Sequence, residues 1–422
     1  MQGMAIILGK YKQQGETIRG KIAPAEGGPA MKIMHTGDWH IGKIVNQRHM
    51  TPDQEYILEA LLKIVESEKP DVLVVAGDIY DRAVPPVEAV ELLDKILNKI
   101  LLDFKIPIMM IAGNHDSPDR LGFGSKLLQD KGLYIAGRFT KDIRKVSLTD
   151  EFGIVNFYLI PYAPPAVVRD VLSCSEVCDH DTAMQWIMTA IREKWNPKER
   201  NIVVAHGFVR GIEELEMSES EKPLSVTLAV GGTDYVDIKH FEGFTYTALG
   251  HLHGPQQAGS PRVRYAGSLL KYSFSEAKQQ KSATVVQVGK DGELILECKT
   301  LLPLREMRRI KGTLKDLLDP GVHQGTNVED YLHVTLTDEG ELIEPMSKLR
   351  TVYPNVLSLE IEVKERCVGE SKTAAGQGYK HKSKLALFGD FYADMTGQEL
   401  VAEKAAIVAK TIDAVGTEDR GI

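Results

Sequence analysis

Short apolar runs alternate with amphipathic stretches along the chain from Met31 onward. Five of these runs are almost entirely apolar and then break into glycine and polar residues; they cover residues 32–38, 71–78, 106–116, 201–207 and 246–254. Continuous apolar runs of this length are typical of strands that are covered on both faces, as in sheets flanked by helices. We therefore predict buried, mainly parallel strands whose ends carry polar residues.

Three longer stretches between these runs have apolar residues at helical spacing, and they cover residues 55–68, 86–103 and 181–195. We expect these helices to pack on the sheet. Three later runs, at 262–267, 282–289 and 293–301, are joined by turn residues such as Asp291 and Gly292, which predicts antiparallel pairing. The alternation of strands and helices predicts an α/β layer structure.

Composition shifts along the chain suggest five regions. We expect an N-terminal extension (1–30), a large α/β domain (31–304), a small α+β domain (305–366), a flexible linker (367–382) and a helical segment (383–422). The linker assignment depends on the Gly, Ser, Lys and Ala content of "GESKTAAGQGYKHKSK". The small domain is predicted from two strand-like runs separated by a helix-like one.

The C-terminal segment contains two apolar stripes at helical spacing. One comprises Leu385, Phe388, Tyr392 and Met395, and the other comprises Leu400, Ile407, Val408 and Ile412. So short a segment cannot bury both stripes by itself. Either the helices pack back on their own domain or they dock on a partner, and the long polar linker favours a partner.

The composition is that of a globular protein, with 43% hydrophobic and 26% charged residues among 422. A formal net charge of −8 argues against nucleic-acid binding through overall charge, but it leaves room for a local basic groove. The four cysteines form no C-x-x-C pair and give no disulfide framework, so we expect a reducing cytoplasm. Because no apolar run reaches about 18 residues, no membrane span is expected.

Each predicted buried strand ends in side chains that can bind a metal. They are Asp38, His40, Asp78, Asn114, His206, His251 and His253. The carboxyl ends of parallel strands meet at one edge of a sheet, so these side chains are expected to converge. Oxygen and nitrogen donors without thiolates suit manganese, iron, magnesium or zinc. Seven ligands exceed the needs of one ion but suit two ions that share a carboxylate.

His251 and His253 are two residues apart at the end of a predicted strand. On an extended chain such residues point to the same face, which aims both rings at one region. A single histidine after an apolar run is more often a satisfied core residue, and Asp38 or Asp78 taken alone suits a cap or a turn. All five motifs in order make the metal interpretation the stronger one.

The motifs "GDWH", "GDIYD", "GNHD", "AHG" and "GHLH" resemble the signature of the calcineurin-like metallophosphoesterase superfamily. Residues 31–43 and 265–276 are similar, more narrowly, to nuclease subunits that act with an SMC-like ATPase at DNA ends. The resemblance covers roughly residues 31–400. It implies a layered β-sandwich flanked by helices, with residues 305–366 as a capping domain that positions DNA and a C-terminal helical hairpin.

The resemblance also implies roles for individual residues. Asp38, His40 and His253 would hold one divalent cation, Asn114, His206 and His251 the other, and Asp78 would bridge them. The cations would be Mn²⁺, with Mg²⁺ as the alternative. His115 would contact the phosphate and assist the leaving oxygen, and the Asp81 carboxylate is a candidate for orienting His115. Asp116 is expected to shape the loop.

For partners, the resemblance implies an SMC-like ATPase bound through residues 383–415, DNA as substrate and a homodimer formed by the nuclease domain, in the cytoplasm beside the nucleoid. The expected activity is exonucleolytic on duplex ends and endonucleolytic on hairpins and single strands. Lys43, Arg48, Arg82 and Arg120 follow the metal motifs and are candidates for lining the approach of DNA, with no one of them singled out.

Two other functions compete with the nuclease. A small-molecule phosphodiesterase or a protein phosphatase uses the same metal scaffold, but a Ser/Thr phosphatase would carry G-D-x-V-D-R-G and G-N-H-E where this chain has "GDIYDRA" and "GNHD". A compact phosphodiesterase would not need the capping domain, linker and hairpin. A scaffold that has lost catalysis should have replaced ligands, and all seven are present.

Overall fold

A computed structural model describes residues 30–211, 215–221, 235–340, 342–362 and 382–418. The chain divides into two compact units, and each is described by itself. The first comprises Met1–Thr335 with Ile343–Glu360, and the second comprises Leu336–Leu342 with Ile361–Ile422. The predicted extension at 1–30 and the linker at 367–382 lie almost wholly outside the described residues. The predicted boundary near residue 304 falls within the first unit.

The first sheet contains six strands in the order β16-β15-β1-β4-β5-β6. Their bounds are β1 Met31–Thr36, β4 Val72–Val75, β5 Ile108–Ile111, β6 Leu133–Ala136, β15 Ser282–Val288 and β16 Leu294–Thr300. Strands β1, β4, β5 and β6 are parallel, whereas β15 runs antiparallel to β1 and to β16. The antiparallel pairing predicted for the last two runs is thus confirmed.

The second sheet also has six strands, in the order β13-β14-β12-β9-β8-β7. Their bounds are β7 Arg144–Asp150, β8 Gly153–Ile160, β9 Arg200–His206, β12 Tyr246–Gly250, β13 Gln256–Ser260 and β14 Val263–Tyr265. Strand β14 pairs parallel to β12 and antiparallel to β13. The prediction that residues 262–267 pair with the later strands is therefore wrong, because the chain changes sheet between β14 and β15.

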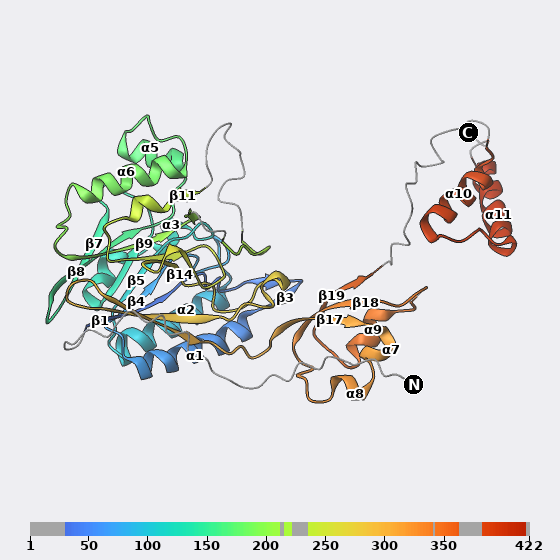
Figure 1. Cartoon of the computed structure of the whole chain (residues 1–422), viewed down its shortest axis with the longest axis horizontal. Helices are drawn as coiled ribbons and strands as arrows, with labels where there is room; N and C mark the ends of the chain where they lie inside the picture. The colour runs from blue at the N-terminus through green and yellow to red at the C-terminus, as the bar shows by residue number, and fades with distance from the viewer. Residues whose placement is uncertain (1–29, 212–214, 222–234, 341, 363–381, 419–422) are drawn as a thin grey trace. The chain divides into compact units, whose positions relative to one another are not determined.

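The two sheets stack with their inner faces together, and helices cover both outer faces (Figure 1). The shared core contains Ile33, Val74 and Ile111 from the first sheet with Phe157, Val204 and Ala248 from the second. Helices α1 (Thr51–Glu68) and α2 (Val87–Asn98), followed by the turn η1 (Lys99–Asp103), pack on the first sheet. Helices α5 (Pro165–Leu172) and α6 (His180–Arg192) pack on the second. The predicted α/β layered sandwich is confirmed.

Helix α1 illustrates how periodicity fixes this packing. Ile57, Leu61 and Val65 recur every four residues, and each is at most 1% exposed against the first sheet. Burying such a side chain contributes about 1.5–3 kcal/mol, and truncating Leu61 to alanine is expected to cost about 2–5 kcal/mol. The helix starts four residues before the predicted stretch because Pro52 suits a first helical turn.

The rest of the first unit is a small α+β region with a three-stranded sheet in the order β17-β18-β19. Its elements are β17 Met307–Gly312, α7 Leu314–Leu317, α8 Pro320–His323, β18 Tyr331–Leu336, α9 Pro345–Arg350 and β19 Val356–Ile361. Asp53 at the start of α1 accepts hydrogen bonds from Arg305 at 2.9 Å and from the Tyr331 hydroxyl at 2.8 Å. These contacts join the small region to the sandwich.

Short elements occupy the connections. They are β2 Ile44–Val45, β3 Arg48–His49, α3 Pro118–Leu121, α4 Ser125–Leu128, η2 Gln129–Lys131, β10 Val209–Arg210, β11 Val236–Asp237, η3 Ile238–Phe241 and η4 Phe274–Glu276. Strands β6, β7, β8 and β13 were not predicted; β7 and β13 in particular contain no continuous apolar run.

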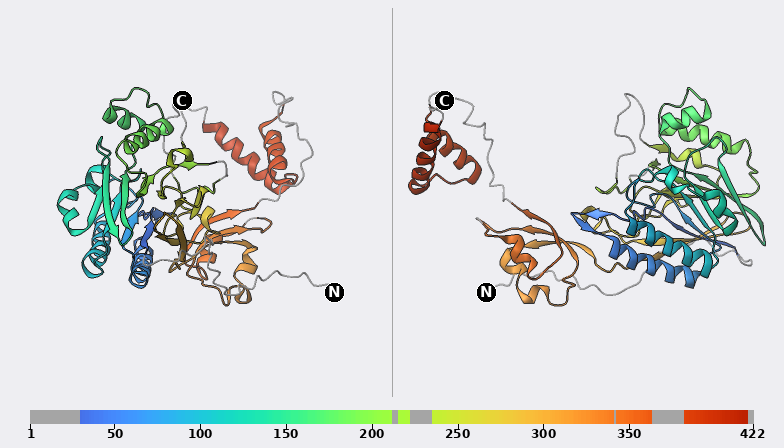
Figure 2. Two further views of the ribbon diagram at one scale, coloured as in Figure 1. Left: turned by 60° about the vertical axis from the view of Figure 1, so that its left-hand side comes forward. Right: turned by 180° about the vertical axis from the view of Figure 1, so that it is seen from behind.

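In the second unit, α10 (Lys384–Thr396) and α11 (Ala402–Glu418) form a helical hairpin (Figure 2). The Ser383 side chain caps α10, and Gly397 ends it with a left-handed φ of 65°. From residue 382 to residue 412, no side chain whose burial is described is buried. Throughout the described chain, no helix is long and apolar enough to cross a membrane.

Candidate metal centre

The seven predicted donors lie at the carboxyl ends of five strands. Those that follow β1, β4 and β5 come from the first sheet, and those at the end of β9 and after β12 come from the second. The expectation of one sheet edge is therefore wrong in this respect, because two stacked sheets each contribute an edge. The donor atoms nevertheless lie within a few ångströms of one another.

Glycines in the motifs allow the two sheets to approach each other at this edge. A Cβ atom at Gly250 would lie 1.8 Å from the Ala76 carbonyl oxygen, and one at Gly113 would lie 2.2 Å from Asp78 Oδ1. Both distances are far below van der Waals contact, so only glycine fits. The glycines thus set how close the ligand-bearing segments come.

Four of the predicted ligands have a left-handed backbone. The φ values are 51° at Asp38, 47° at His40, 50° at Asp78 and 112° at His251. Such residues cost of order 1–3 kcal/mol each and persist where the surrounding structure imposes them, often at functional sites. Contacts elsewhere in the fold therefore hold these four residues in a left-handed conformation that is unfavourable for non-glycine residues.

The two histidines of "GHLH" point to different neighbours. Strand β12 ends at Gly250 and His251 is not extended, so the i, i+2 rule of a strand does not apply. The His251 ring lies 5.4 Å from that of His206, and the His253 ring lies 5.0 Å from that of His40, between centroids. Each of the two rings therefore has its own histidine companion.

Asp78 lies at the centre of the donors. Its Oδ2 atom is 3.6 Å from His40 Nε2 and 3.5 Å from His206 Nε2. On one side His40 Nε2 is 3.1 Å from His253 Nε2, and on the other His206 Nε2 is 2.9 Å from Asn114 Oδ1. The donor atoms of five residues thus face one another across a few ångströms.

Burial shapes the charge of this cluster. It lowers the pKa of His40 and His251 well below the ordinary value and that of His206 to about 4, so these rings are neutral. Burial, followed by repulsion from Asp78, raises the pKa of Asp38 well above its usual range, and burial raises that of Asp78 to about 6. Neutral imidazoles beside buried carboxylates suit a divalent cation.

Two groups of donor atoms lie within 4.8 Å of one another: His40, Asp78 and His115, and Asp38, Asp78 and His206. Asp78 belongs to both, as the predicted bridging role requires. The grouping differs from the one that the resemblance implies, because Asp38 lies with His206 and His115 lies with His40. A ring nitrogen of His115 is thus close enough to His40 and Asp78 to act as a metal ligand.

The family model of calcineurin-like phosphoesterases matches residues 31–255, which is more than half of the chain. The chain belongs to this family. A second model, the type 5 capsule protein repressor C-terminal domain, matches residues 303–396. Members of the phosphoesterase family bind divalent metals, and the donor groups above can hold them.

The SbcD subunit of the nuclease SbcCD from Staphylococcus epidermidis is 33% identical to this phosphoesterase over 370 residues, which cover 88% of this chain and 95% of the relative. Two solved structures are more distant, at 12% identity. A dimetal phosphatase from Danio rerio aligns with a TM-score of 0.41 over 66% of this chain and 98% of its own. A protein from Thermus thermophilus aligns with a TM-score of 0.37 over 63% and 98%.

His115 of the phosphoesterase is held by a main-chain oxygen. Its Nδ1 donates to the Asp81 carbonyl oxygen at 2.7 Å, whereas the Asp81 carboxylate is 3.9 Å from the same atom. That carboxylate instead accepts from Lys43 Nζ at 2.7 Å. The main chain of Asp81, and not the carboxylate that was expected to do so, therefore orients the His115 ring. Lys43 forms an ion pair with that carboxylate.

Asp116 shapes the loops of the phosphoesterase, as expected. Its carboxylate accepts from the main-chain N–H groups of Ile79 at 3.1 Å, Tyr80 at 2.9 Å and Gly113 at 2.9 Å. It therefore ties the loop after β4 to the loop after β5. Burial, followed by repulsion from Asp78, raises the pKa of Asp116 to about 7.

Sequence reasoning missed two charged residues beside the centre, Glu276 and Lys281. Their exposed fractions are 0% and 4%, and Glu276 Oε1 lies 3.3 Å from His253 Nδ1. A glutamate in a short turn and a lysine before a strand carry no pattern that distinguishes them from surface residues. The one signal in the sequence was for Glu276, which ends the stretch 265–276 that resembles the nuclease subunits; Lys281 lies outside that stretch.

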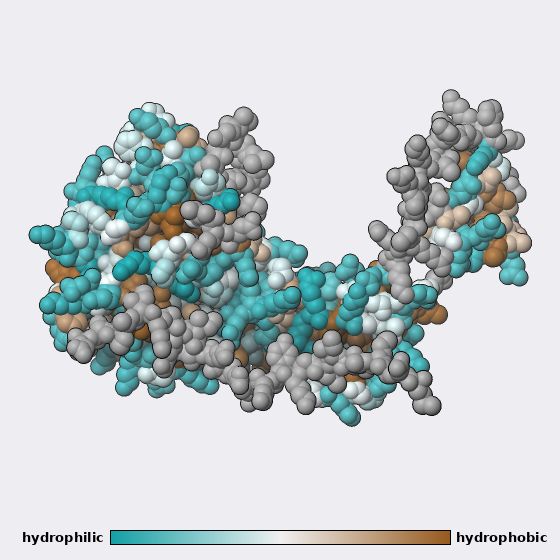
Figure 3. All heavy atoms as spheres, in the orientation of Figure 1, coloured by the Kyte–Doolittle hydropathy of each residue, from teal (hydrophilic) through white to brown (hydrophobic). Residues whose placement is uncertain are grey.

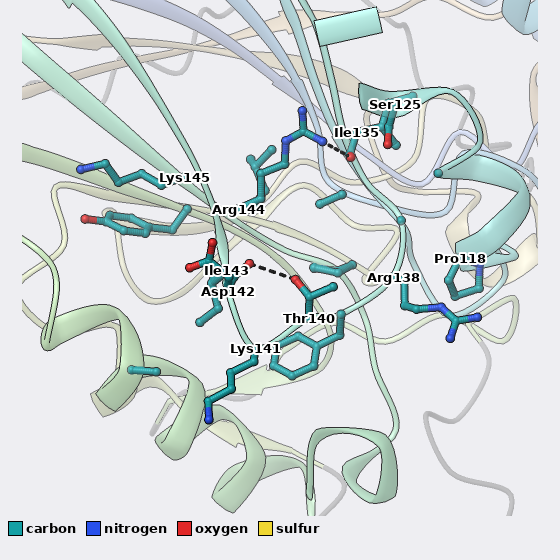
Figure 4. A pocket seen from close by; sticks show the side chains of 18 of the residues that line it. Pro118, Ser125, Ile135, Arg138, Thr140, Lys141, Asp142, Ile143, Arg144 and Lys145 are labelled. Carbon is teal, nitrogen blue, oxygen red and sulfur yellow. Dashed lines mark hydrogen bonds between the residues drawn. The ribbon is translucent and has the colours of Figure 1, made fainter. Parts of the chain in front are cut away.

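A separate pocket of about 820 Å³ lies between the segments 118–145 and 158–194 of the phosphoesterase. Cationic side chains such as Lys141, Arg144 and Lys145 line it, and Arg144 donates to the Ile135 carbonyl oxygen at 2.7 Å (Figure 4). None of the predicted metal ligands contributes to the lining of this pocket. The catalytic chemistry is therefore not placed there.

Proposed function

We propose that this phosphoesterase is the nuclease subunit of an SbcCD-type complex, a metal-dependent enzyme that hydrolyses DNA phosphodiester bonds in end processing, repair and recombination in the cytoplasm. The observation that carries the proposal is the likeness to the staphylococcal SbcD subunit, which spans 95% of that relative. The match of residues 303–396 to a second family model supports it further, because a compact phosphatase would not need this region.

We assign two divalent cations to the donor cluster, Mn²⁺ in the first place. Asp38, His40 and His253 would hold one, Asn114, His206 and His251 the other, and Asp78 both. The near-equal distances from Asp78 Oδ2 to His40 Nε2 and His206 Nε2 support the bridging assignment. Such a pair of cations activates a water nucleophile and stabilises the charge that develops on the phosphate oxygens.

His115 is proposed to protonate the leaving oxygen. A carbonyl oxygen only accepts, so the contact with Asp81 places one ring proton on Nδ1 and turns Nε2 toward Asp78, 3.9 Å away. When this ring also carries a proton on Nε2, it can deliver that proton to the leaving oxygen and return to the neutral form with its proton on Nδ1. Asp116 and the glycines hold the loops that carry it.

The C-terminal hairpin is proposed to bind an SbcC-type, SMC-like ATPase through residues 383–415. Phe391 is 58% exposed, Met395 68% and Ile407 67%, so apolar surface is left on both helices. Figure 3 shows apolar atoms at the surface of this segment. A segment with no described buried side chain needs a partner to cover it.

We further propose a homodimer formed by the nuclease domain. Val87 and Val90 on α2 are 69% and 45% exposed, Phe123 between α3 and α4 is 86% exposed, and Leu127 on α4 is 82% exposed. The two segments follow β4 and β5, which are neighbouring parallel strands. The double variant Phe123→Glu/Leu127→Glu should have the mass of a monomer by light scattering; an unchanged dimer would place the interface elsewhere.

One experiment tests the main proposal. Blunt, hairpin and single-stranded DNA are incubated with the chain, with and without Mn²⁺ and with and without the ATPase, beside a chromogenic phosphodiester and a phosphopeptide. We expect Mn²⁺-dependent cleavage of DNA. Turnover of the small substrates with no cleavage of DNA would favour the phosphodiesterase or phosphatase, and bound metal without any hydrolysis would favour a scaffold.

A further inference from the structure

A buried ion pair lies behind one of the metal-centre histidines. Glu276 ends η4 and Lys281 directly precedes β15, and Lys281 Nζ donates to Glu276 Oε2 at 2.6 Å. Taking two charges out of water costs about as much as their attraction returns, so a buried pair adds little stability by itself. Its position therefore points to a role other than stabilising the fold.

The ring of His253 is connected to Glu276 in two ways, directly with Nδ1 3.3 Å from Oε1, and through one hydroxyl. Ser220 Oγ is 2.7 Å from His253 Nδ1 and donates to Glu276 Oε1 at 2.5 Å. A carboxylate only accepts hydrogen bonds, so the Ser220 proton is used toward Glu276 and the ring must donate to Ser220. Nδ1 of His253 is thus the protonated nitrogen, and Nε2 keeps its lone pair.

That lone pair faces the metal centre, because His253 Nε2 lies 3.1 Å from His40 Nε2. A ligand histidine is commonly oriented in this manner by a carboxylate on its far nitrogen. Here the carboxylate would fix both the tautomer and the direction of the ring.

Lys281 holds the main chain of the same residue. Its ammonium donates to the His253 carbonyl oxygen at 2.8 Å and to Ser268 Oγ at 2.9 Å, in addition to Glu276. The ion pair therefore contacts His253 at two points: Glu276 contacts the ring and Lys281 binds the main-chain carbonyl oxygen. It also keeps the buried carboxylate charged beside a neutral ring.

We propose that Glu276 and Lys281 are positioning residues, which fix the tautomer and orientation of His253 and thereby set the affinity of the metal position that His253 serves. The inference rests on the proposed metal centre. Partners of this kind typically change metal affinity by about 10–100-fold when removed.

Two double variants of the full chain test the role of the carboxylate. Glu276→Met/Lys281→Met removes both charges and the acceptor for the ring, without leaving one buried charge unpaired. Glu276→Gln/Lys281→Met also removes both charges but keeps an amide oxygen at position 276. The two variants thus share the loss of both charges and differ only at position 276, where glutamine offers an acceptor oxygen with an amide NH2 group and methionine offers neither. Mn²⁺ binding to metal-free protein is measured by calorimetry, and histidine tautomers by nitrogen-15 NMR.

Asp150→Asn is the matched control. Asp150 pairs with Arg200, and their side chains are 13% and 6% exposed, so this ion pair is also largely buried. It lies at the amino end of β9, whereas the metal ligand His206 is at the carboxyl end. Loss of this ion pair should lower the melting temperature of the protein and leave its Mn²⁺ affinity within about twofold of that of the unaltered chain. The variant thus shows how much destabilisation alone changes Mn²⁺ binding.

We expect the Met/Met variant to weaken one of two Mn²⁺ binding events by about 10–100-fold and to lose the Nδ1-protonated tautomer of His253. The Gln/Met variant should recover most of both. Unchanged binding by Met/Met, or equal weakening of both double variants, would overturn the positioning role. If the unaltered chain binds no Mn²⁺, the proposed metal centre is wrong. The role of Glu276 is then still tested in metal-free protein, because the Nδ1-protonated tautomer of His253 should be present in the unaltered chain and lost in the Met/Met variant.

Discussion

The metal centre of the first unit and the helical hairpin of the second use their residues in opposite ways. At the centre, charged and polar side chains are buried, and hydrogen bonds within the unit orient them, as for Asp116 with its three main-chain donors. In the hairpin, apolar side chains such as Met395 are exposed. The first arrangement is organised by contacts within the unit, and the second leaves apolar surface exposed.

On the proposed function, the first region carries the chemistry and the second carries the assembly. Changes at the centre should therefore abolish hydrolysis without affecting partner binding, and changes in the hairpin should do the reverse. Three predictions test this division and a fourth tests the stability of the first unit, in order from the largest expected effect to the smallest.

Replacing the shared carboxylate should have the largest effect. Asp78→Asn removes the charge that both proposed cations use, so activity should fall on the order of 10³-fold or more, with loss of bound metal. Phosphodiesterase rates and metal analysis of the purified variant measure this. Asp142→Asn, whose side chain is 96% exposed, is the control and should behave as the unaltered chain. Full metal content in Asp78→Asn would remove the bridging role.

His115→Asn separates a proton donor from a ligand. If His115 protonates the leaving oxygen, cleavage should fall by about 10²–10⁴-fold while both metals stay bound. His115 also lies within 4.8 Å of His40 and Asp78, so the structure offers a ligand role as well. Metal analysis distinguishes the two, because loss of one cation would make His115 a ligand.

Removing residues 380–422 tests the second region. The truncated chain should retain its Mn²⁺-dependent hydrolysis of a small phosphodiester and lose binding to the ATPase in a pull-down. A finer version is Phe391→Glu/Met395→Glu, with Lys384→Glu as a control that changes charge on the same helix without touching those apolar side chains. Retained binding by the truncated chain would place the partner surface outside the hairpin.

The smallest effect concerns a buried histidine away from the metal ligands. His35 Nδ1 accepts from the Tyr246 hydroxyl at 2.9 Å and Nε2 donates to the Leu249 carbonyl oxygen at 3.2 Å, which joins β1 to β12. Burial lowers the pKa of His35 from 6.5 to about 3. Below pH 6.5 the unfolded chain therefore binds a proton that the folded chain does not, and stability falls as the pH falls.

By pH 5 the contribution of His35 to this loss should reach about 2 kcal/mol, since one pKa unit corresponds to about 1.4 kcal/mol. Urea unfolding of the first unit at pH 7.5 and pH 5, in chelator, measures it. His35→Asn should be less stable than the unaltered chain at pH 7.5 but lose less on acidification. Equal losses in both proteins would mean that His35 is protonated in the folded state.

The sequence by itself determined the local structure and the inventory of donors. Period and apolar content predicted α1, α6, β1, β4 and β9, because the side chains of a helix or strand repeat at fixed intervals. The donor residues were marked by their place at strand ends, and Asp116 was assigned to the loop that it ties. The same local signals could not place β14 (Val263–Tyr265), because its neighbour β13 contains no continuous apolar run and was not predicted as its partner.

Only the tertiary structure decided how those donors meet. Sheet membership depends on pairing between distant segments, so the sequence did not show that two stacked sheets each contribute an edge. His251 has a left-handed backbone, and its ring lies beside that of His206, whereas the ring of His253 lies beside that of His40. The alternation of side chains along a strand does not predict this arrangement. The same holds for the carbonyl oxygen that holds His115 and for Glu276 behind His253: side-chain directions at bent, buried segments are set by packing.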